Sequence, residues 1–189
     1  MLAVSDSSSL IYLSKIKKIK LLKELFKKIY VPKEVYSETI TEGAKKSESD
    51  IFLIEELIKE EFIEVKEVKN RLDIKSLHLG ELKAISLCQE LGIKNLLIDD
   101  KDGYSATEIL GLNPLRTTSI LLILLDKEII SLMDYENSLK ELIKNEFFIE
   151  DKLYDILIMA GRNKNHKTLM GLLVVLGLPL IISSILAIT

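Results

Sequence analysis

Several residue types are scarce in this chain, and each shortage excludes a class of protein. The sequence of 189 residues holds 1 cysteine, so no disulfide can form within the chain and a reducing compartment is expected. It has no tryptophan and 6% aromatic residues, which is not typical of a surface that stacks nucleic-acid bases. Neither sign of charge dominates, since 26 basic residues stand against 29 acidic ones. This balance excludes a protein whose whole surface binds nucleic acid, although a local basic patch is compatible with it.

The residues of several common catalytic and binding motifs are missing as well. With 2 histidines, His78 and His166, the chain offers no serine–histidine–aspartate arrangement. It has neither a Walker loop nor a G-x-G-x-x-G sequence, so nucleotide binding has no support. His78 precedes a predicted helix and is interpreted as a cap or a surface residue, and Cys88 as a small buried apolar residue.

Short apolar runs alternate with segments of helical periodicity along most of the chain. The predicted strands are residues 2–4, 29–32, 62–68 and 95–98, with residues 116–118 as a last edge strand. The predicted helices are residues 10–16, 18–26, 33–40, 51–59, 79–91, 104–111, 119–125, 135–145 and 151–160, with a polar turn at residues 41–49. Ser7, Ser8 and Ser9 are the candidate N-caps of the first helix. This alternation favours a three-layer α/β fold in which a central parallel sheet lies between helices.

The most informative residues are five acids that lie at or just after apolar runs. Asp6 follows the first predicted strand, and Asp99 and Asp100 follow the apolar run NLLI. In an open α/β sheet, ligands bind at the carboxyl edge, which is where an acid that follows a strand is delivered. Glu38 and Glu81 lie on predicted helices among apolar residues and are the two further candidates.

Carboxylates from distant parts of a chain repel one another when they meet at one sheet edge. At about 4 Å and an effective dielectric constant near 20, each like-charge pair costs roughly 4 kcal/mol. A bound divalent cation removes this cost, and ligands that are all oxygen suit Mg²⁺ or Mn²⁺. The sequence therefore predicts metal-dependent hydrolysis.

Each acid also has a structural interpretation that the sequence leaves open. Asp6 could be the N-cap of the helix that follows it, and Glu38 could simply face solvent. Glu81 lies at a helix start, where its charge interacts favourably with the helix dipole. One of Asp99 and Asp100 could cap the next helix while the other points into the site.

The C-terminal tail differs from everything before it. Residues 168–189 carry no charged side chain, and as a helix they would extend about 33 Å, enough to cross a hydrocarbon core of about 30 Å. Residues 162–167 form a basic collar with Arg162, Lys164 and Lys167, and no charge follows the tail. The positive-inside rule then predicts a C-terminal transmembrane helix that keeps the globular part on the cytoplasmic face of the membrane. The alternative is a cytoplasmic protein whose hydrophobic C-terminal helix packs on the domain or on a partner subunit.

A row of lysines near the first strand is a second charged feature. It could steer RNA phosphates toward the acids, or it could be the solvated face of a helix. The solvated face is the favoured interpretation because the whole chain is rich in lysine. The row consists of Lys15, Lys17, Lys18, Lys20, Lys23, Lys27 and Lys28.

Taken together, the segments VSDSSSLIYLSKI, LLKELFKKIYVPKEVYSE, LHLGELKAISLCQELGIKNLLIDD and ATEILGLN form a family pattern. From residue 2 to about residue 161, the chain resembles the PIN-domain family of metal-dependent ribonucleases, in particular a prokaryotic, largely archaeal branch related to the toxins of toxin–antitoxin pairs. The resemblance implies a three-layer α/β/α domain over residues 1–161. It also implies that Asp6, Glu38, Glu81 and Asp99 bind Mg²⁺ or Mn²⁺ and catalyse hydrolysis, with Asp100 as an adjacent ligand.

The chain departs from this family pattern at two positions and in its tail. Relatives usually carry an arginine soon after the aspartate pair, where this chain has Tyr104. A glycine that is usual before the final short strand is Arg116 here. Both positions lie near the expected substrate side, and the hydrophobic tail is an added feature.

Two functions from different classes follow from the resemblance. The first is a PIN-type endoribonuclease, toxin-like in character, that hydrolyses RNA phosphodiesters and is tethered to the membrane by residues 168–189. The second is a catalytically weak PIN fold that serves as a binding module at the membrane. The resemblance suggests two protein partners: a second copy of the chain, in a homodimer, and an antitoxin protein.

Overall fold

The computed structural model describes residues 1–46, 48–69, 72, 74 and 77–163. The chain divides into two compact units, Met1–Thr117 and Thr118–Thr189, which are described separately below. The predicted tail at residues 168–189 and most of the basic collar lie outside the described residues. In the part of the chain that is described, no helix is both long enough and apolar enough to span a bilayer.

The first unit is built on a sheet of five strands, all of them parallel. The strand order is β3-β2-β1-β4-β5, so β1 lies at the centre with β2 on one side and β4 on the other. The strands are β1 (Leu2–Ser5), β2 (Lys28–Pro32), β3 (Ile63–Lys66), β4 (Asn95–Leu97) and β5 (Asn113–Leu115). The predicted central parallel sheet is therefore confirmed.

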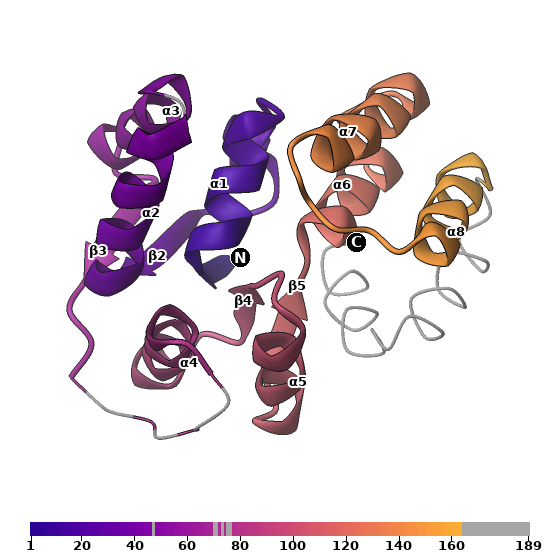
Figure 1. The fold of residues 1–189 in the computed structure, drawn as a ribbon. Helices are drawn as coiled ribbons and strands as arrows, with labels where there is room; N and C mark the ends of the chain where they lie inside the picture. The colour runs from indigo at the N-terminus through magenta and orange to yellow at the C-terminus, as the bar shows by residue number, and fades with distance from the viewer. Residues whose placement is uncertain (47, 70–71, 73, 75–76, 164–189) are drawn as a thin grey trace. The chain divides into compact units, whose positions relative to one another are not determined.

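Helices flank this sheet on both faces (Figure 1). In Figure 1, α4 and α5 lie on one side of the strands, and α1, α2 and α3 lie on the other. The helices of the first unit are α1 (Ser7–Lys15), the 3₁₀ helix η1 (Ile19–Glu24), α2 (Lys33–Lys46), α3 (Glu48–Lys59), α4 (Leu79–Leu91) and α5 (Lys101–Ile109). Because helices cover both faces of the sheet, Ala3 and Val4 of the central strand β1 are fully buried.

The core of the first unit forms where α4 packs against the central strands. Val4 of β1 and Leu96 of β4 are 0% exposed, as are Ile85 and Cys88 on the facing side of α4. Cys88 is a free, buried thiol, which confirms its interpretation as a small apolar residue. Gly92 ends α4 in the left-handed conformation, with φ of 64°, a backbone angle that favours glycine.

Four predictions about individual elements differ from the structure. The N-cap of α1 is Asp6, not one of the serines at positions 7–9. The predicted helix at residues 18–26 is the shorter 3₁₀ helix η1. Residues 41–46, predicted as a turn, continue α2, because Glu, Ala and Lys favour a helix despite the glycine among them. The last edge strand is Asn113–Leu115, so Arg116 follows this strand instead of beginning it.

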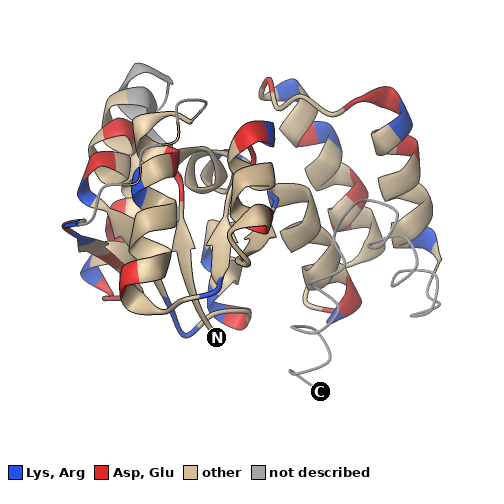
Figure 2. Cartoon of the chain, turned by 90° about the horizontal axis from the view of Figure 1, so that it is seen from below, with Lys and Arg blue, Asp and Glu red and all other residues tan. Residues whose placement is uncertain are grey.

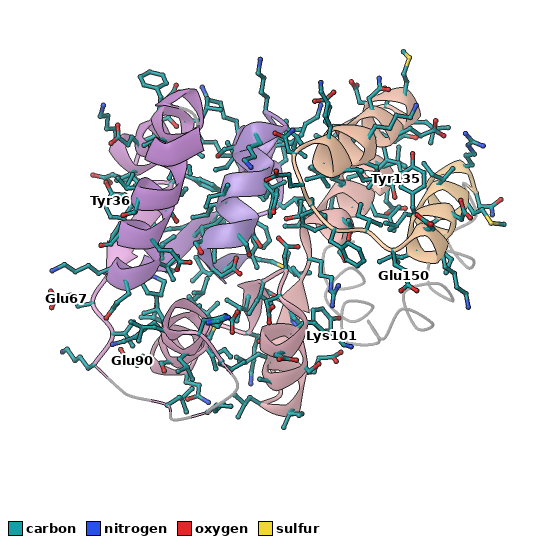
Figure 3. All side chains as sticks on the ribbon, viewed as in Figure 1. Tyr36, Glu67, Glu90, Lys101, Tyr135 and Glu150 are labelled. Atoms are coloured by element: carbon teal, nitrogen blue, oxygen red, sulfur yellow. The ribbon has the colours of Figure 1, made fainter. Side chains whose placement is uncertain are left out.

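The second unit consists of helices in its described part. They are α6 (Thr117–Asp126), whose first residue closes the first unit, α7 (Leu132–Lys144) and α8 (Asp151–Arg162). The hydroxyl of Tyr135, labelled in Figure 3, donates to the carbonyl of Leu157 at 3.1 Å and joins α7 to α8. A Cβ on Gly161 would lie 2.6 Å from the Tyr135 ring, so only glycine permits this close packing.

Candidate functional site

The strand order creates a switch point between β1 and β4. From β1 the chain moves outward to β2 and β3, and it then returns to the other side of β1 to form β4. In open α/β sheets, ligands bind outside the carboxyl ends of the strands at such a point. Ser5 of β1 is aligned with Leu97 of β4, and the next residue, Asp6, donates its backbone N–H to the Leu97 carbonyl at 3.0 Å. Asp6 and Asp99 therefore leave the sheet side by side at its switch point.

Asp6 is buried, with 4% of its surface exposed. One carboxylate oxygen accepts the backbone N–H of Ser9 at 3.0 Å, which makes Asp6 the N-cap of α1. The other accepts the hydroxyl of Ser8 at 2.6 Å. The helix therefore holds the Asp6 carboxylate in one orientation, and the structural role that the sequence left open for this acid is real.

Asp99 is half-buried and accepts three hydrogen bonds. One oxygen accepts the backbone N–H of Thr117 at 2.8 Å. The other accepts the Thr117 hydroxyl at 2.7 Å and the Ser9 hydroxyl at 3.0 Å. Three donors leave about one lone-pair site of this carboxylate for another ligand. Asp99 is thus fixed between the start of α1 and the end of β5.

Ser9 connects the two acids, because its N–H donates to Asp6 and its hydroxyl donates to Asp99. Burial, and then the neighbouring charge of Asp99, raise the pKa of Asp6 to about 7. Burial also raises the pKa of Asp99, an effect opposed by its hydrogen bonds from Thr117 and Ser9 and by the charge of Arg116. Within the described residues, neither acid forms an ion pair with a lysine or an arginine. We call Asp6 and Asp99 the acid pair.

The other three predicted acids lie on or next to helices: Glu81 and Asp100 at helix starts and Glu38 in the second turn of α2. Asp100 is the N-cap of α5 and accepts the N–H groups of Asp102 and Gly103, which confirms that one member of the aspartate pair caps this helix. Glu81, in the first turn of α4, accepts the backbone N–H of His78 at 3.1 Å. Burial is the main cause that raises the pKa of Glu81, and the charge of Asp100 adds to it.

Two glycines bring the glutamates close to neighbouring helices. A Cβ on Gly80, in the first turn of α4, would lie 2.8 Å from a carboxylate oxygen of Glu38, which is exposed on α2. A Cβ on Gly103, in the first turn of α5, would lie 3.3 Å from the Glu81 carboxyl carbon. Glu38 therefore approaches the start of α4, and Glu81 approaches the start of α5.

A divalent cation fits the acid pair. Mg²⁺ commonly binds proteins through one or two carboxylates and completes its shell with water and substrate phosphate. Two neighbouring carboxylates, buried enough to raise their pKa and without an ion-pair partner, are a donor set of this kind. In the described part of the chain, no three histidine, cysteine, aspartate or glutamate side chains are close enough together to hold a metal ion. Among the described residues, Glu38, Glu81 and Asp100 therefore form no metal-binding cluster with the acid pair.

The two residues that depart from the family pattern contact each other. The guanidinium carbon of Arg116 lies 4.7 Å from the centre of the Tyr104 ring, a cation–π contact worth roughly 0.5–2 kcal/mol. Arg116 directly follows β5, and Tyr104 is buried on α5. A positive charge therefore lies at the carboxyl edge of the sheet, next to the acid pair.

The lysine row lies away from the acids. Lys28 begins β2 and is paired in register with Leu2, so it marks the amino edge of the sheet, opposite Asp6. Figure 2 shows acidic and basic residues interspersed along the helices of the first unit. Three lysines of the row form ion pairs: Lys20 with Glu56, Lys23 with Glu60 and Lys28 with Glu64. These pairs support the interpretation of the row as a solvated surface.

Comparison with known families decides the identity of this fold. The DUF3368 family, described as a PIN domain, matches residues 2–161. The chain belongs to the PIN-domain family. This match covers the five-stranded sheet, the acid pair and all the described helices, and it supports a nuclease of the PIN type at the level of the family.

Solved structures and curated proteins add little to this assignment. A PilT N-terminus domain protein from the hyperthermophilic archaeon Sulfolobus solfataricus P2 is similar to this PIN domain, with 20% sequence identity and a TM-score of 0.44. The similarity covers 62% of this chain and 87% of that protein. No curated protein matches the chain.

Three residues of this PIN domain's site were not singled out from the sequence for the contacts they make. They are Ser8 and Ser9, which donate to the acid pair, and Thr117, which donates to Asp99 from 18 residues further along the chain. The serines stand directly after Asp6 and were interpreted only as N-caps. Nothing in the local pattern marks Thr117, because its role depends on β5 lying beside β4.

Proposed function

We propose that this PIN domain is a divalent-metal-dependent endoribonuclease that hydrolyses RNA phosphodiesters. The observation that carries the proposal is the acid pair, one buried and one half-buried carboxylate held next to each other at the switch point of a parallel sheet. Asp6 and Asp99 would hold Mg²⁺ or Mn²⁺. We propose Glu38, Glu81 and Asp100 as further ligands that act through water. Asp100 directly follows Asp99 and caps α5, Glu81 approaches the start of α5, and Glu38 approaches the start of α4.

The protein's own contribution to the reaction is orientation. When bound, a divalent cation activates water and offsets the charge that develops on the phosphate. Ser9 and Thr117 donate to Asp99 and fix which of its lone pairs faces the site. The N-cap geometry of α1 does the same for Asp6, so neither carboxylate has to reorganise when substrate arrives.

A cleavage assay tests this proposal. Wild-type protein is incubated with single-stranded RNA and Mn²⁺, alongside Asp6→Asn, Asp99→Asn and the control Glu24→Gln, which removes an exposed acid of η1. We expect cleavage by the wild type and the control, and a loss of at least about 100-fold in the two aspartate variants, because cleavage would depend on the ion that they hold. Intact RNA at saturating Mn²⁺ with retained RNA or protein binding would instead favour the alternative, a catalytically weak PIN fold that serves as a binding module.

We further propose that residues 168–189 tether the nuclease to the cytoplasmic face of the membrane. The support is the sequence itself, with no charge in this segment and basic residues only before it. Fractionation of the full-length chain and of a chain ending at residue 167 tests the tether. We expect the full-length chain in the membrane fraction and the shorter one in the soluble fraction. If both remain in the soluble fraction without detergent, the chain is cytoplasmic and the tether is wrong.

Two protein partners remain proposals. PIN relatives form homodimers and bind antitoxin proteins, and we propose both partners and a toxin-like character for this chain from its resemblance to them. Light scattering on the purified chain measures its mass in solution. Co-expression with the protein encoded by the adjacent gene tests for a stable complex that suppresses RNA cleavage.

A further inference from the structure

Arg116 is held at the same sheet edge as the acid pair. It follows the last residue of β5, and the next residue, Thr117, donates both its N–H and its hydroxyl to Asp99, at 2.8 and 2.7 Å. Two hydrogen bonds hold Thr117 against Asp99. Arg116 directly precedes Thr117, so its backbone is also held close to the acid pair. Its position is therefore a consequence of the site's own construction.

The side chain of Arg116 lies over the face of the Tyr104 ring. The guanidinium carbon lies 4.7 Å from the ring centre, and the ring is buried on α5. A stacked guanidinium uses its flat face and keeps its N–H groups, which point outward in the plane, for other partners. Among the described residues, none forms a hydrogen bond or an ion pair with this guanidinium. Arg116 is half-buried, so part of the group reaches solvent.

A held guanidinium with unused donors fits a phosphate, because the fork of N–H groups matches two phosphate oxygens. A role as counter-ion to Asp99 explains less, since the oxygens of Asp99 already accept from Ser9 and Thr117. We infer that Arg116, positioned by Tyr104, binds a non-bridging phosphate oxygen of the nucleic-acid strand that lies over the acid pair. The inference rests on the proposed nuclease function. It assigns Arg116 to substrate binding and Tyr104 to positioning.

Charge explains why the site needs such a residue. Two carboxylates repel an approaching phosphate, and the lysine row cannot offset this repulsion because it lies at the opposite edge of the sheet and is partly paired with glutamates. Arg116 brings a positive charge to the carboxyl edge itself.

Binding of a fluorescent single-stranded RNA to the full-length protein tests the inference, with Ca²⁺ in place of Mn²⁺ and the RNA checked for integrity on a gel. We expect Arg116→Gln to weaken binding about tenfold and to reduce the slope of log affinity against log salt by about 0.7, the value for one lost contact to a single strand. Tyr104→Leu should weaken binding while Tyr104→Phe, which keeps the ring, should retain it. Arg116→Lys should bind more weakly than the wild type, because an ammonium group lacks the planar pair of N–H donors that a guanidinium offers to phosphate. The matched control is Lys27→Gln, which removes one exposed charge at the amino edge and should bind like the wild type.

Wild-type affinity and salt slope in Arg116→Gln would overturn the inference, as would an equal loss in Lys27→Gln, or no RNA binding by the wild type. Thermal melts of each variant show whether the fold is intact, and Tyr104→Phe and Arg116→Lys keep the test informative if the larger changes unfold the protein. If RNA binding depends on Arg116 but no Mn²⁺-dependent cleavage occurs, the nuclease proposal is wrong and the assignment of Arg116 to phosphate binding is supported. If the wild type cleaves RNA and Arg116→Gln has the same RNA affinity and the same kcat/KM, the inference about Arg116 is wrong and the nuclease proposal is supported.

Discussion

Asp6 and Asp99 leave neighbouring parallel strands, and Ser9 donates a hydrogen bond to each of these two acids. Burial, followed by the charge of Asp99, raises the pKa of Asp6 to about 7, where an ordinary aspartate would be fully ionised. A folded protein without metal therefore carries an unfavourable charge at its switch point. A divalent cation would remove this cost, which is why the pair is the centre of the proposed function.

The first prediction concerns pH and stability without metal. Between the unfolded pKa of 3.8 and the folded pKa of about 7, the native state holds a proton on Asp6 that the unfolded state has lost. The free energy of unfolding must then fall as pH rises through this window, by up to about 4 kcal/mol, and level off above it. Urea unfolding of the EDTA-treated protein at pH 5 and pH 8 measures the change.

Asp6→Asn is the matched variant for this measurement, because asparagine caps helices about as well as aspartate. It should show a smaller loss of stability between pH 5 and pH 8, and it should be more stable than the wild type at pH 8. An identical pH dependence in the two proteins would contradict the electrostatic account. Added Mn²⁺ should stabilise the wild type more at pH 8 than at pH 5, because a proton must leave Asp6 before metal binds.

The second prediction concerns the donors that orient Asp99. Ser9→Ala removes a hydroxyl that donates to Asp99 at 3.0 Å but keeps the N–H that caps α1 through Asp6. Thr117→Val removes the hydroxyl donor at 2.7 Å and keeps the side-chain shape. Because each variant loses a hydrogen bond to a charged group, we expect each to lower the free energy of unfolding by roughly 1.5–3 kcal/mol.

Ser37→Ala is the control for these two variants, since Ser37 is exposed on α2 and donates only to a backbone carbonyl of its own helix. Denaturant unfolding of all the proteins should show little change in this control. If Ser9→Ala and Thr117→Val cost no more than Ser37→Ala, these hydroxyls do not hold Asp99, and the proposed orientation of the site is wrong.

The third prediction tests whether Glu38 belongs to the site. A Cβ on Gly80 would lie 2.8 Å from a Glu38 carboxylate oxygen, so Gly80→Ala must displace this exposed, flexible side chain. The fold should tolerate the change and gain up to about 1 kcal/mol from the helix propensity of alanine. Affinity for Mn²⁺ should fall by the same factor as in Glu38→Gln. Unchanged affinity in both variants would remove Glu38 from the site.

Gly103→Ala provides the contrast, because its Cβ would lie 2.5 Å from the Ile98 side chain and 3.3 Å from the Glu81 carboxyl carbon. Ile98 is 0% exposed and cannot move freely. This variant should therefore lose roughly 1–3 kcal/mol of stability through overpacking, in addition to any effect on Glu81. Thermal melts of the two glycine variants separate these cases.

The parallel sheet and the position of Asp6 could be predicted from the sequence because both follow from local pattern. Apolar runs alternate with helical periods, and an acid directly after a strand must lie at the carboxyl edge of the sheet. The pattern also offered one of Asp99 and Asp100 as a candidate cap for the next helix, and Asp100 has this role. It could not show which acids meet, because strand order decides this.

The errors concern the last strand of the sheet and a contact between residues of different elements. The last strand begins at Asn113, three residues before the edge strand predicted at residues 116–118, and it accommodates Pro114 because β5 is an edge strand. The contact between Tyr104 and Arg116 could not be predicted either, since it links the first half of α5 to the residue after β5. Such a contact depends on how α5 packs beside β5.

Calorimetric titration of the purified protein with Mn²⁺ tests the central claim that the acid pair holds a divalent cation. The account predicts saturable binding to the wild type at pH 7, with a measured enthalpy that changes with the ionisation enthalpy of the buffer because Asp6 releases a proton. It also predicts loss of this binding in Asp6→Asn and Asp99→Asn and its retention in Glu24→Gln. No binding by the wild type, or equal binding by Asp6→Asn, would contradict the account.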